Sequence, residues 1–337
     1  ELNPREMLAQ IGYAHFLSER RGALKLADVQ FRRAIEASPS SGLALSARAA
    51  FFDAHMNDPE TAEALHRDAL ERDVFNPTIL CRFAQHLAGR PGMADEAESL
   101  FRDALALNPR SGAALRAYAR FLEMTRGDND QAEALLRRAV DADPHGVESH
   151  DALANFLHRV REDAEEAEIY FREALRLAPN RAETLHRFAL FLRDTRRDLS
   201  EAEDYFRRAV TRNPRDAGTL ARAAQFLLAE GQRMEGLRML NDAFDAAWRM
   251  DQAARPPELM LELWLYRCLH DGGRRDEALT AIMGLIDAGV RIDGWELGPN
   301  VQEALRAGHP DPELMRDLVR VATEGAPREV LRNKHRL

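Results

Sequence analysis

Histidine and cysteine are the residue types in this sequence that could carry acid–base catalysis, supply a nucleophile or bind a transition metal. The chain of 337 residues has 11 His and only 2 Cys, Cys81 and Cys268. On a helix, Cys81 and His86 would point about 140° apart, so they cannot converge on one metal ion. No Gly-rich phosphate loop, HExxH, GxSxG, CxxC or EF-hand pattern occurs. The sequence therefore predicts a protein that is not an enzyme and has no catalytic, cofactor or metal site.

The charge balance and hydropathy of the chain narrow its class further. Its 47 basic and 56 acidic residues give a net charge of -9, whereas a general nucleic-acid binder would be basic. The opening segment, ELNPREMLAQ, lacks the basic and apolar regions of a signal peptide, and no apolar run approaches the roughly 18 residues of a membrane helix. Two distant cysteines fit a reducing compartment. We expect a cytoplasmic protein with no membrane contact.

A repeat of 35 residues organises most of the chain. One alanine recurs at this period without a gap: Ala14, Ala49, Ala84, Ala119, Ala154, Ala189 and Ala224. Further alanine series begin at Ala27 and Ala34, and prolines stand on the same grid at Pro39, Pro109, Pro144, Pro179 and Pro214. Such recurrence is the signature of a repeat architecture, in which each unit packs only on its neighbours.

Each unit contains two helical patterns separated by a short polar break. The first reads Leu-x-x-aromatic-Ala-x-x-Leu, as in Leu115, Tyr118, Ala119 and Leu122, and this spacing makes one apolar face. A Phe two residues after the series alanine, such as Phe121, gives the same helix a second apolar flank. The first helix of each unit must therefore lie between neighbours on two sides.

The second helical pattern combines an apolar stripe with a charged face. Its stripe has the spacing of Ala167, Phe171, Ala174 and Pro179, and the proline ends the helix. An acidic residue stands four positions before an arginine in each copy: Asp28/Arg32, Glu63/Arg67, Glu98/Arg102, Glu133/Arg137, Glu168/Arg172 and Glu203/Arg207. This order suits helical ion pairs worth about 0.2–0.5 kcal/mol each, and we interpret these pairs as a solvated outer face.

These two patterns resemble the first and second helices of the tetratricopeptide repeat. The resemblance covers about residues 7–250 and implies an all-α, right-handed α-solenoid of about seven helix-turn-helix repeats, near 7–41, 42–76, 77–111, 112–146, 147–181, 182–216 and 217–250. The period of 35 exceeds the family's value of about 34, and the extra residue lies between the two helices of a unit. His66 and His86 stand where other repeats have Phe or Leu, and we interpret them as interior residues.

The C-terminal region, 251–337, is predicted to be a degenerate helix pair followed by a helical cap, because repeat arrays need a terminal unit with a polar outer face. Two short helices are expected near 299–307 and 311–323. The three tryptophans, Trp248, Trp264 and Trp295, fall in or beside this region. We interpret them as its hydrophobic core.

Helical geometry locates one face that both apolar flanks of the first helices leave open. Residues three before, one after and four after the series alanine lie on this arc. The resemblance implies that the stacked arcs form a concave groove that holds extended peptides or helices. Its predicted binding residues, including two arginines at its border, are Arg82, Gln85, Arg116, Arg120, Asn155, His158, His186, Arg187 and Arg193.

The sequence thus favours an interaction scaffold or adaptor whose groove binds a peptide or helical segment of a partner protein. The hypothesis is that this segment is acidic and is bound through bidentate arginine contacts. Nearby Glu123, Asp151 and Asp194 can neutralise part of this charge, so ordinary surface charge stays an alternative. His158 and His186 lie on adjacent first helices, but two histidines without a third ligand make a poor metal site. Two other functions stay open: a self-assembling structural repeat protein, and a pentatricopeptide-like RNA binder.

Overall fold

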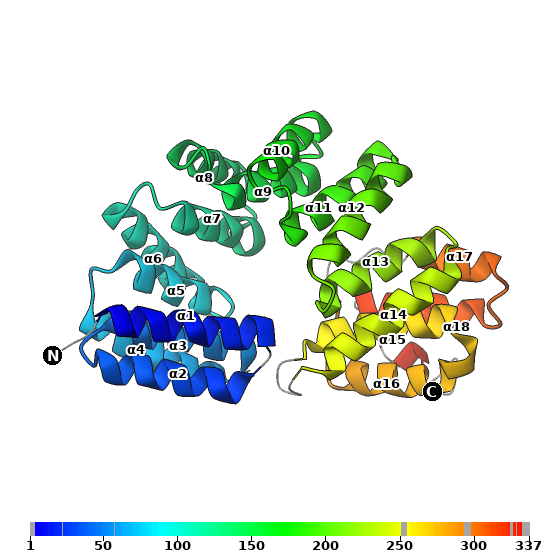
Figure 1. Cartoon of the computed structure of the whole chain (residues 1–337), viewed down its shortest axis with the longest axis horizontal. Helices are drawn as coiled ribbons and strands as arrows, with labels where there is room; N and C mark the ends of the chain where they lie inside the picture. The colour runs from blue at the N-terminus through cyan, green and yellow to red at the C-terminus, as the bar shows by residue number, and fades with distance from the viewer. Residues whose placement is uncertain are drawn as a thin grey trace. The chain divides into compact units, whose positions relative to one another are not determined.

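A computed structural model of the chain describes residues 4–21, 23–56, 58–250, 255–292, 298–323, 326–327 and 329–331. Within these ranges every regular element is helical and there is no strand, so the predicted all-α class is confirmed. The helices follow one another as antiparallel pairs in a solenoid-like arrangement (Figure 1). The chain divides into two compact units, Glu1–Phe191 and Leu192–Leu337. The predicted boundary near residue 250 stays a prediction.

The helix bounds of the two units are as follows. The first unit contains α1 (Pro4–Arg21), α2 (Leu24–Ala37), α3 (Gly42–His55), α4 (Pro59–Arg72), α5 (Pro77–Ala88), α6 (Ala94–Leu107), α7 (Gly112–Phe121), η1 (Leu122–Arg126), α8 (Asn129–Ala142), α9 (Val147–Phe156), η2 (Leu157–Arg161), α10 (Ala164–Leu177) and α11 (Ala182–Phe191). The second contains η3 (Leu192–Arg196), α12 (Leu199–Arg212), α13 (Ala217–Ala229), α14 (Arg233–Trp248), α15 (Pro257–His270), η5 (Gly272–Arg274), α16 (Arg275–Asp287), α17 (Gly298–Arg306) and α18 (Pro312–Thr323).

The periodic alanines are the points of closest helix packing. Every member of the series of Ala14, Ala27 and Ala34 is at most 1% exposed. A methyl side chain lets two helix backbones approach closely, and larger side chains fill the space on either side of the contact. The 35-residue alanine grid therefore encodes the packing within and between the helix pairs.

Aromatic contacts join consecutive repeats. The Phe of one second helix meets the Phe that follows the series alanine in the next first helix, with ring centroids 5.1 Å apart for Phe31–Phe51 and 5.5 Å apart for Phe101–Phe121. Both members of each pair are buried. Such tilted aromatic pairs add about 0.5–1.5 kcal/mol beyond the area they bury. They are the second apolar flank predicted from the sequence.

In the helix pairs that begin with α7, α9 and α11, the extra residue of the 35-residue period lies in the last turn of the first helix, and not between the helices as the sequence predicted. That turn is a π-helix in η1, η2 and η3, where it accommodates one more residue than an α-helical turn. A left-handed residue then ends the helix: Gly127, Glu162 or Arg197. The next residue is an aspartate that caps the following helix, as Asp128 does by accepting from the backbone N–H of Gln131.

The six predicted acid–arginine pairs are all present as i, i+4 ion pairs. Several of their members also bind the next repeat, which the sequence analysis did not predict. Glu133, for example, accepts from Arg161 at 2.7 Å, while Arg137 donates to Glu166 at 2.6 Å. On the outer face, ion pairs therefore connect a second helix with the second helix of the next repeat and with the end of the next first helix.

The second unit contains the two short helices expected near its C-terminus, α17 and α18. Trp264 is buried there against Phe244, with ring centroids 4.7 Å apart, as expected for a core residue. Trp248 is half exposed, and the Arg255 guanidinium lies 4.2 Å from its ring centroid, so the prediction that Trp248 is a core residue is wrong. Trp295 lies outside the described residues. Along the described helices, none is both long and apolar enough to cross a membrane.

The left-handed residues after the π turns provide a test of how the longer period is accommodated. Gly127 has a φ of 67°, and a Cβ added there would meet nothing within 4 Å. Gly127→Ala should therefore cost about 1 kcal/mol from backbone strain alone, whereas Glu162→Gly should gain roughly 0.5 kcal/mol. Urea unfolding followed by circular dichroism measures both changes. Equal stabilities for wild type and Gly127→Ala would contradict the left-handed ending.

Candidate functional site

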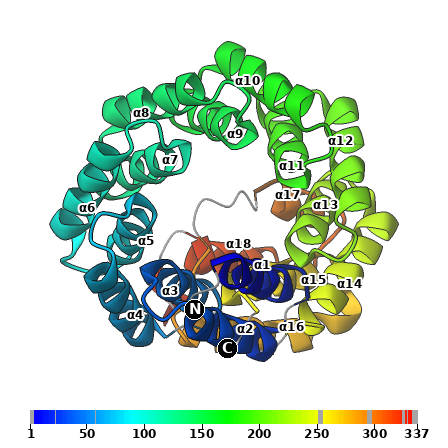
Figure 2. The ribbon, with the colours of Figure 1, turned by 60° about the vertical axis from the view of Figure 1, so that its left-hand side comes forward.

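The inner face of the first unit is formed by its first helices. Consecutive first helices contact one another directly, α3 with α5, α5 with α7 and α7 with α9. Figure 2 shows α5, α7 and α9 on the inner side of this unit and α6, α8 and α10 on its outer side. The predicted binding residues from Arg82 to Arg187 lie on these first helices or in the π turn that ends one of them.

Arg82 on α5 and Arg116 on α7 are partly buried near one another, with Cys81 between them. Burial raises the pKa of the Cys81 thiol to about 11, and the two guanidinium charges oppose that rise. Burial also lowers the pKa of both arginines. Arg116 donates to the Ser149 hydroxyl at 3.0 Å, and one nitrogen of Arg82, Nη1, is buried without a hydrogen-bond partner. Neither arginine forms an ion pair within the described part of the chain.

Arg120, Gln85 and Asn155 add polar groups to the same face. Arg120 follows Arg116 by one turn of α7 and is exposed, with no ion pair to any residue that the structure describes. Gln85 is exposed on α5, and Asn155 is partly buried on α9. Each of these side chains can donate hydrogen bonds to a ligand. We refer to Arg82, Arg116 and Arg120 as the inner arginine cluster.

Other predicted binding residues are occupied by contacts within the protein. Arg187 on α11 forms an ion pair with the buried Asp151 of α9 and a second with Glu183 at 2.7 Å. His158 packs edge-on against Phe191, with ring centroids 5.2 Å apart. The neutralisation by nearby acids that the sequence suggested therefore takes the form of ion pairs at Arg187, whereas Arg116 has Glu148 and Asp143 nearby without an ion pair.

His186 and Arg193 complete the predicted set. His186 is partly buried on α11, one turn before Leu190. Arg193 belongs to the second unit, where its side chain is nearly buried and pairs with Asp194 at 2.9 Å. Because its charge is already matched, Arg193 contributes less to an anion site than the inner arginine cluster does.

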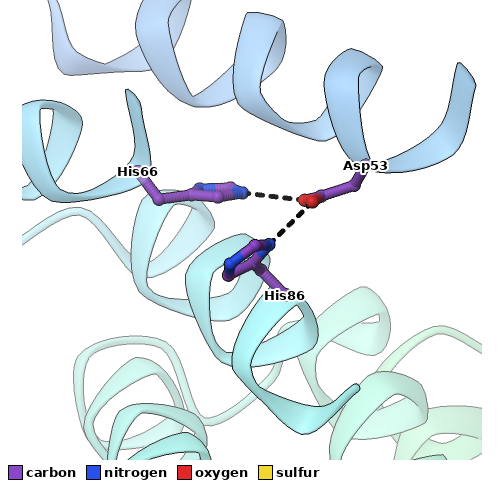
Figure 3. A group of neighbouring side chains, drawn as sticks. All are labelled: Asp53, His66 and His86. Carbon is purple, nitrogen blue, oxygen red and sulfur yellow. Dashed lines mark hydrogen bonds and ion pairs between the residues drawn. The ribbon is translucent and has the colours of Figure 1, made fainter. Parts of the chain in front are cut away.

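The structure also brings together three residues that the sequence analysis did not combine. Asp53 of α3 lies between His66 of α4 and His86 of α5 (Figure 3). Its Oδ1 is 2.6 Å from His86 Nδ1, and its Oδ2 is 3.1 Å from His66 Nε2. Both imidazoles are buried, while the Asp53 side chain is 29% exposed. Within the described ranges, this group has the donor types and spacing to hold a metal ion.

Comparison with known proteins identifies the family. Two models of the tetratricopeptide repeat match the sequence, one over residues 90–156 and the other over 161–181. The chain contains tetratricopeptide repeats. Members of this family are in general non-catalytic scaffolds that bind protein or peptide partners. A comparison with curated protein sequences gives no match.

Solved structures share the tetratricopeptide repeat fold with this chain. Yeast Tom70 is 18% identical, with 93% of this chain and 63% of Tom70 covered at a TM-score of 0.59. The human IFIT1 dimer with m7Gppp-AAAA is 16% identical, with 99% of this chain and 82% of IFIT1 covered at a TM-score of 0.57. Identities this low show a common fold and do not transfer a ligand.

The Asp151–Arg187 pair gives a prediction about the energetics of this face. Burial raises the pKa of Asp151, and Arg187 opposes the rise. Arg187→Ala should therefore destabilise the protein by about 1–3 kcal/mol, because it leaves a buried carboxylate without its partner. The pKa of Asp151 then rises further, so the folded state holds a proton that the unfolded chain releases, and stability falls as the pH rises through that range.

Urea unfolding at about pH 5 and about pH 8 measures this dependence. The loss should be larger at the higher pH, and adding Asp151→Asn to Arg187→Ala should recover much of it. A loss of equal size at both pH values would show that the ion pair does not control the charge of Asp151.

Proposed function

We propose that the chain is a non-catalytic scaffold whose inner face in the first unit binds an acidic segment of a partner protein. The observation that supports this most is the inner arginine cluster, Arg82, Arg116 and Arg120. These three arginines lie on the first helices of the inner face and form no ion pair with a described residue, whereas Arg137 and Arg161 on the outer face pair with acids. Arginine binds carboxylates in a bidentate manner, which gives both affinity and orientation.

Partial burial strengthens this argument. A guanidinium group held among helices is incompletely hydrated, so it gains more from an incoming carboxylate than a fully solvated one would. Arg116 uses one nitrogen on Ser149, and the exposed side chain of Arg120 offers its donors to a ligand. Gln85 and Asn155 would hydrogen-bond the ligand backbone, with His158, His186 and Arg187 at the margin of the proposed site.

Fluorescence anisotropy with labelled peptides tests the proposal on the full chain. We expect an Asp- and Glu-rich peptide to bind with a Kd of about 1–100 µM, and a Lys-rich peptide of equal length not to bind. Arg116→Glu combined with Arg120→Glu should weaken binding at least about tenfold, because two attractive charges become repulsive. A peptide with a free carboxyl terminus and its amidated twin will show whether a terminal carboxylate is preferred.

A matched control separates the groove from net charge. Arg33→Glu combined with Arg138→Glu makes the same charge change at exposed positions of the second helices α2 and α8. This variant should bind the acidic peptide like the wild type, and the milder pair Arg116→Gln and Arg120→Gln guards against misfolding. Tight binding by the Arg116→Glu, Arg120→Glu variant would overturn the proposal, as would equal losses in both Glu variants. Preferential, steeply salt-dependent binding of labelled single-stranded RNA would instead favour an RNA binder.

Self-assembly is a second candidate function, and one feature of α1 favours it. Tyr13 and Phe16 stack on each other and are 51% and 45% exposed. The residue equivalent to Phe16 in the next repeat, Phe51, is only 2% exposed, because the preceding helix pair covers it. Exposed aromatic side chains in a group are typical of contact surfaces. A second copy of the chain is the occupant that we infer for this face.

Light scattering across a protein concentration series tests this second function. We expect the molar mass to rise above the monomer value of 38.1 kDa as the concentration increases. Tyr13→Glu combined with Phe16→Glu should hold the mass at the monomer value, because association would bury two charges. A mass that does not depend on concentration in the wild type would contradict self-assembly through α1.

A further inference from the structure

The junction between the second and third repeats breaks the aromatic pattern in a coordinated way. At most of the other junctions two Phe rings meet, as in Phe101–Phe121 and Phe171–Phe191, with centroids 5.5 Å and 5.7 Å apart. At this junction both positions are histidine, and the rings of His66 and His86 are 5.3 Å apart. The two substitutions stand at the same separation in sequence as each Phe pair, so they change both sides of one contact.

Replacing a buried Phe pair by two histidines costs stability. Phe gains its full burial energy at such a site, whereas each imidazole carries two polar nitrogens that need partners. His66 Nδ1 and His86 Nε2 are buried without hydrogen-bond partners in the described structure. Asp53 satisfies the other nitrogen of each ring. A packing role alone does not account for two histidines and a carboxylate at this contact.

The three side chains of this cluster offer the types of donor atom that a transition metal requires. Neutral imidazoles and an ionised carboxylate are the forms that bind a transition metal. The donor atoms already lie within 4.8 Å of one another.

We propose that Asp53, His66 and His86 form a Zn²⁺ site, with His66 Nε2, His86 Nδ1 and one Asp53 carboxylate oxygen as ligands. Around a tetrahedral zinc ion, neighbouring ligand atoms stand about 3.3 Å apart, given bonds of about 2.0–2.1 Å. At present His86 Nδ1 is 2.6 Å from Asp53 Oδ1 and His66 Nε2 is 3.1 Å from Oδ2, so zinc binding moves these side chains apart and selects one of the two oxygens. Metal binding replaces the two hydrogen bonds to Asp53, and the ring protons move to His66 Nδ1 and His86 Nε2.

The second neighbour of His86 supports this arrangement. Its Nε2 faces Glu63 Oε2 at 3.9 Å, so a proton on that nitrogen would point toward a carboxylate. An outer carboxylate that orients a metal-binding histidine is a common feature of zinc sites. Arg67, Arg82 and Arg90 are the nearby cations, and Glu63 pairs with Arg67 at 2.9 Å and with Arg90 at 3.5 Å. Asp53 therefore supplies the negative charge at the metal itself, and Glu63 balances the two arginines.

The fourth coordination position opens toward the inner face of the first unit. Asp53 and His86 line an open pocket of about 280 Å³ together with Ala50, Arg82 and Gln85. Three protein ligands and one solvent-facing position are the arrangement of zinc sites that take an exchangeable ligand. This inference is independent of the acidic-peptide proposal, because it rests on the three ligands and not on the inner arginine cluster.

Isothermal titration calorimetry of the full chain with ZnCl₂, after removal of metals with EDTA and desalting, tests the site. We expect one Zn²⁺ per chain with a Kd of about 10 µM or tighter, a rise in Tm of about 3 °C or more, and no binding of Mg²⁺ or Ca²⁺. Co²⁺ in place of Zn²⁺ should give the visible absorption of a tetrahedral complex. Stoichiometric binding without that absorption would overturn the proposed geometry.

The repeat itself provides the variant that keeps the fold. His66→Phe combined with His86→Phe restores the aromatic pair of the other junctions, so it should fold and melt at or above the temperature of the metal-free wild type. We expect at least a hundredfold loss of Zn²⁺ affinity in this variant. His145→Gln, which removes an exposed histidine outside the cluster, should bind like the wild type. Absence of Zn²⁺ binding in the wild type, or equal binding in the Phe variant, would show that the cluster is only a hydrogen-bonded triad.

Discussion

The close approach of neighbouring helices at the alanine positions is the constraint on which the rest of each unit depends. Because the backbones meet where Ala14, Ala27 and Ala34 and their repeats stand, the larger side chains must fit into the spaces on either side. One of these spaces holds the aromatic pair between repeats, and the outer surface holds the ion pairs. The polar groups of the inner face are therefore presented by a rigid framework, and their spacing follows from that of the helices.

The fold could be predicted from the sequence because the residues at which helices pack together recur at a fixed period. Three alanine series at one period specify where helices pack, and the phase between them specifies the helix pairs. The π turns could not be predicted, since the position of an inserted residue depends on whether a helix end or a loop absorbs it at lower cost. The partners of Glu133 and Arg137 in neighbouring repeats were missed for a similar reason, because they depend on how one repeat is placed on the next. Trp248 shows the limit of composition, since a large apolar residue near a cap need not be inside it.

Helical angles predicted which face of the first helices carries the candidate binding residues. They did not predict which of the charges on that face are paired within the protein. Arg82 and Arg187 occupy equivalent places in the repeat, yet only Arg187 meets a buried carboxylate. The histidine cluster was missed because its members lie on three helices, whereas the sequence analysis compared residues on one helix or on two adjacent first helices. The signal was present in the repeat grid, where His66 and His86 replace both members of one Phe pair.

The ion pairs on the outer face have a mechanical consequence. Within each unit, apolar contacts hold the first helices together, whereas charged side chains such as Arg137 and Glu166 connect neighbouring repeats on the outside. Salt screens exposed charges and leaves apolar packing nearly unchanged or slightly stronger. A higher ionic strength therefore weakens the contacts between repeats on the outer face of each unit, while the apolar contacts between its first helices keep their strength. A peptide bound on the inside would experience a surface whose compliance is set by residues that it never touches.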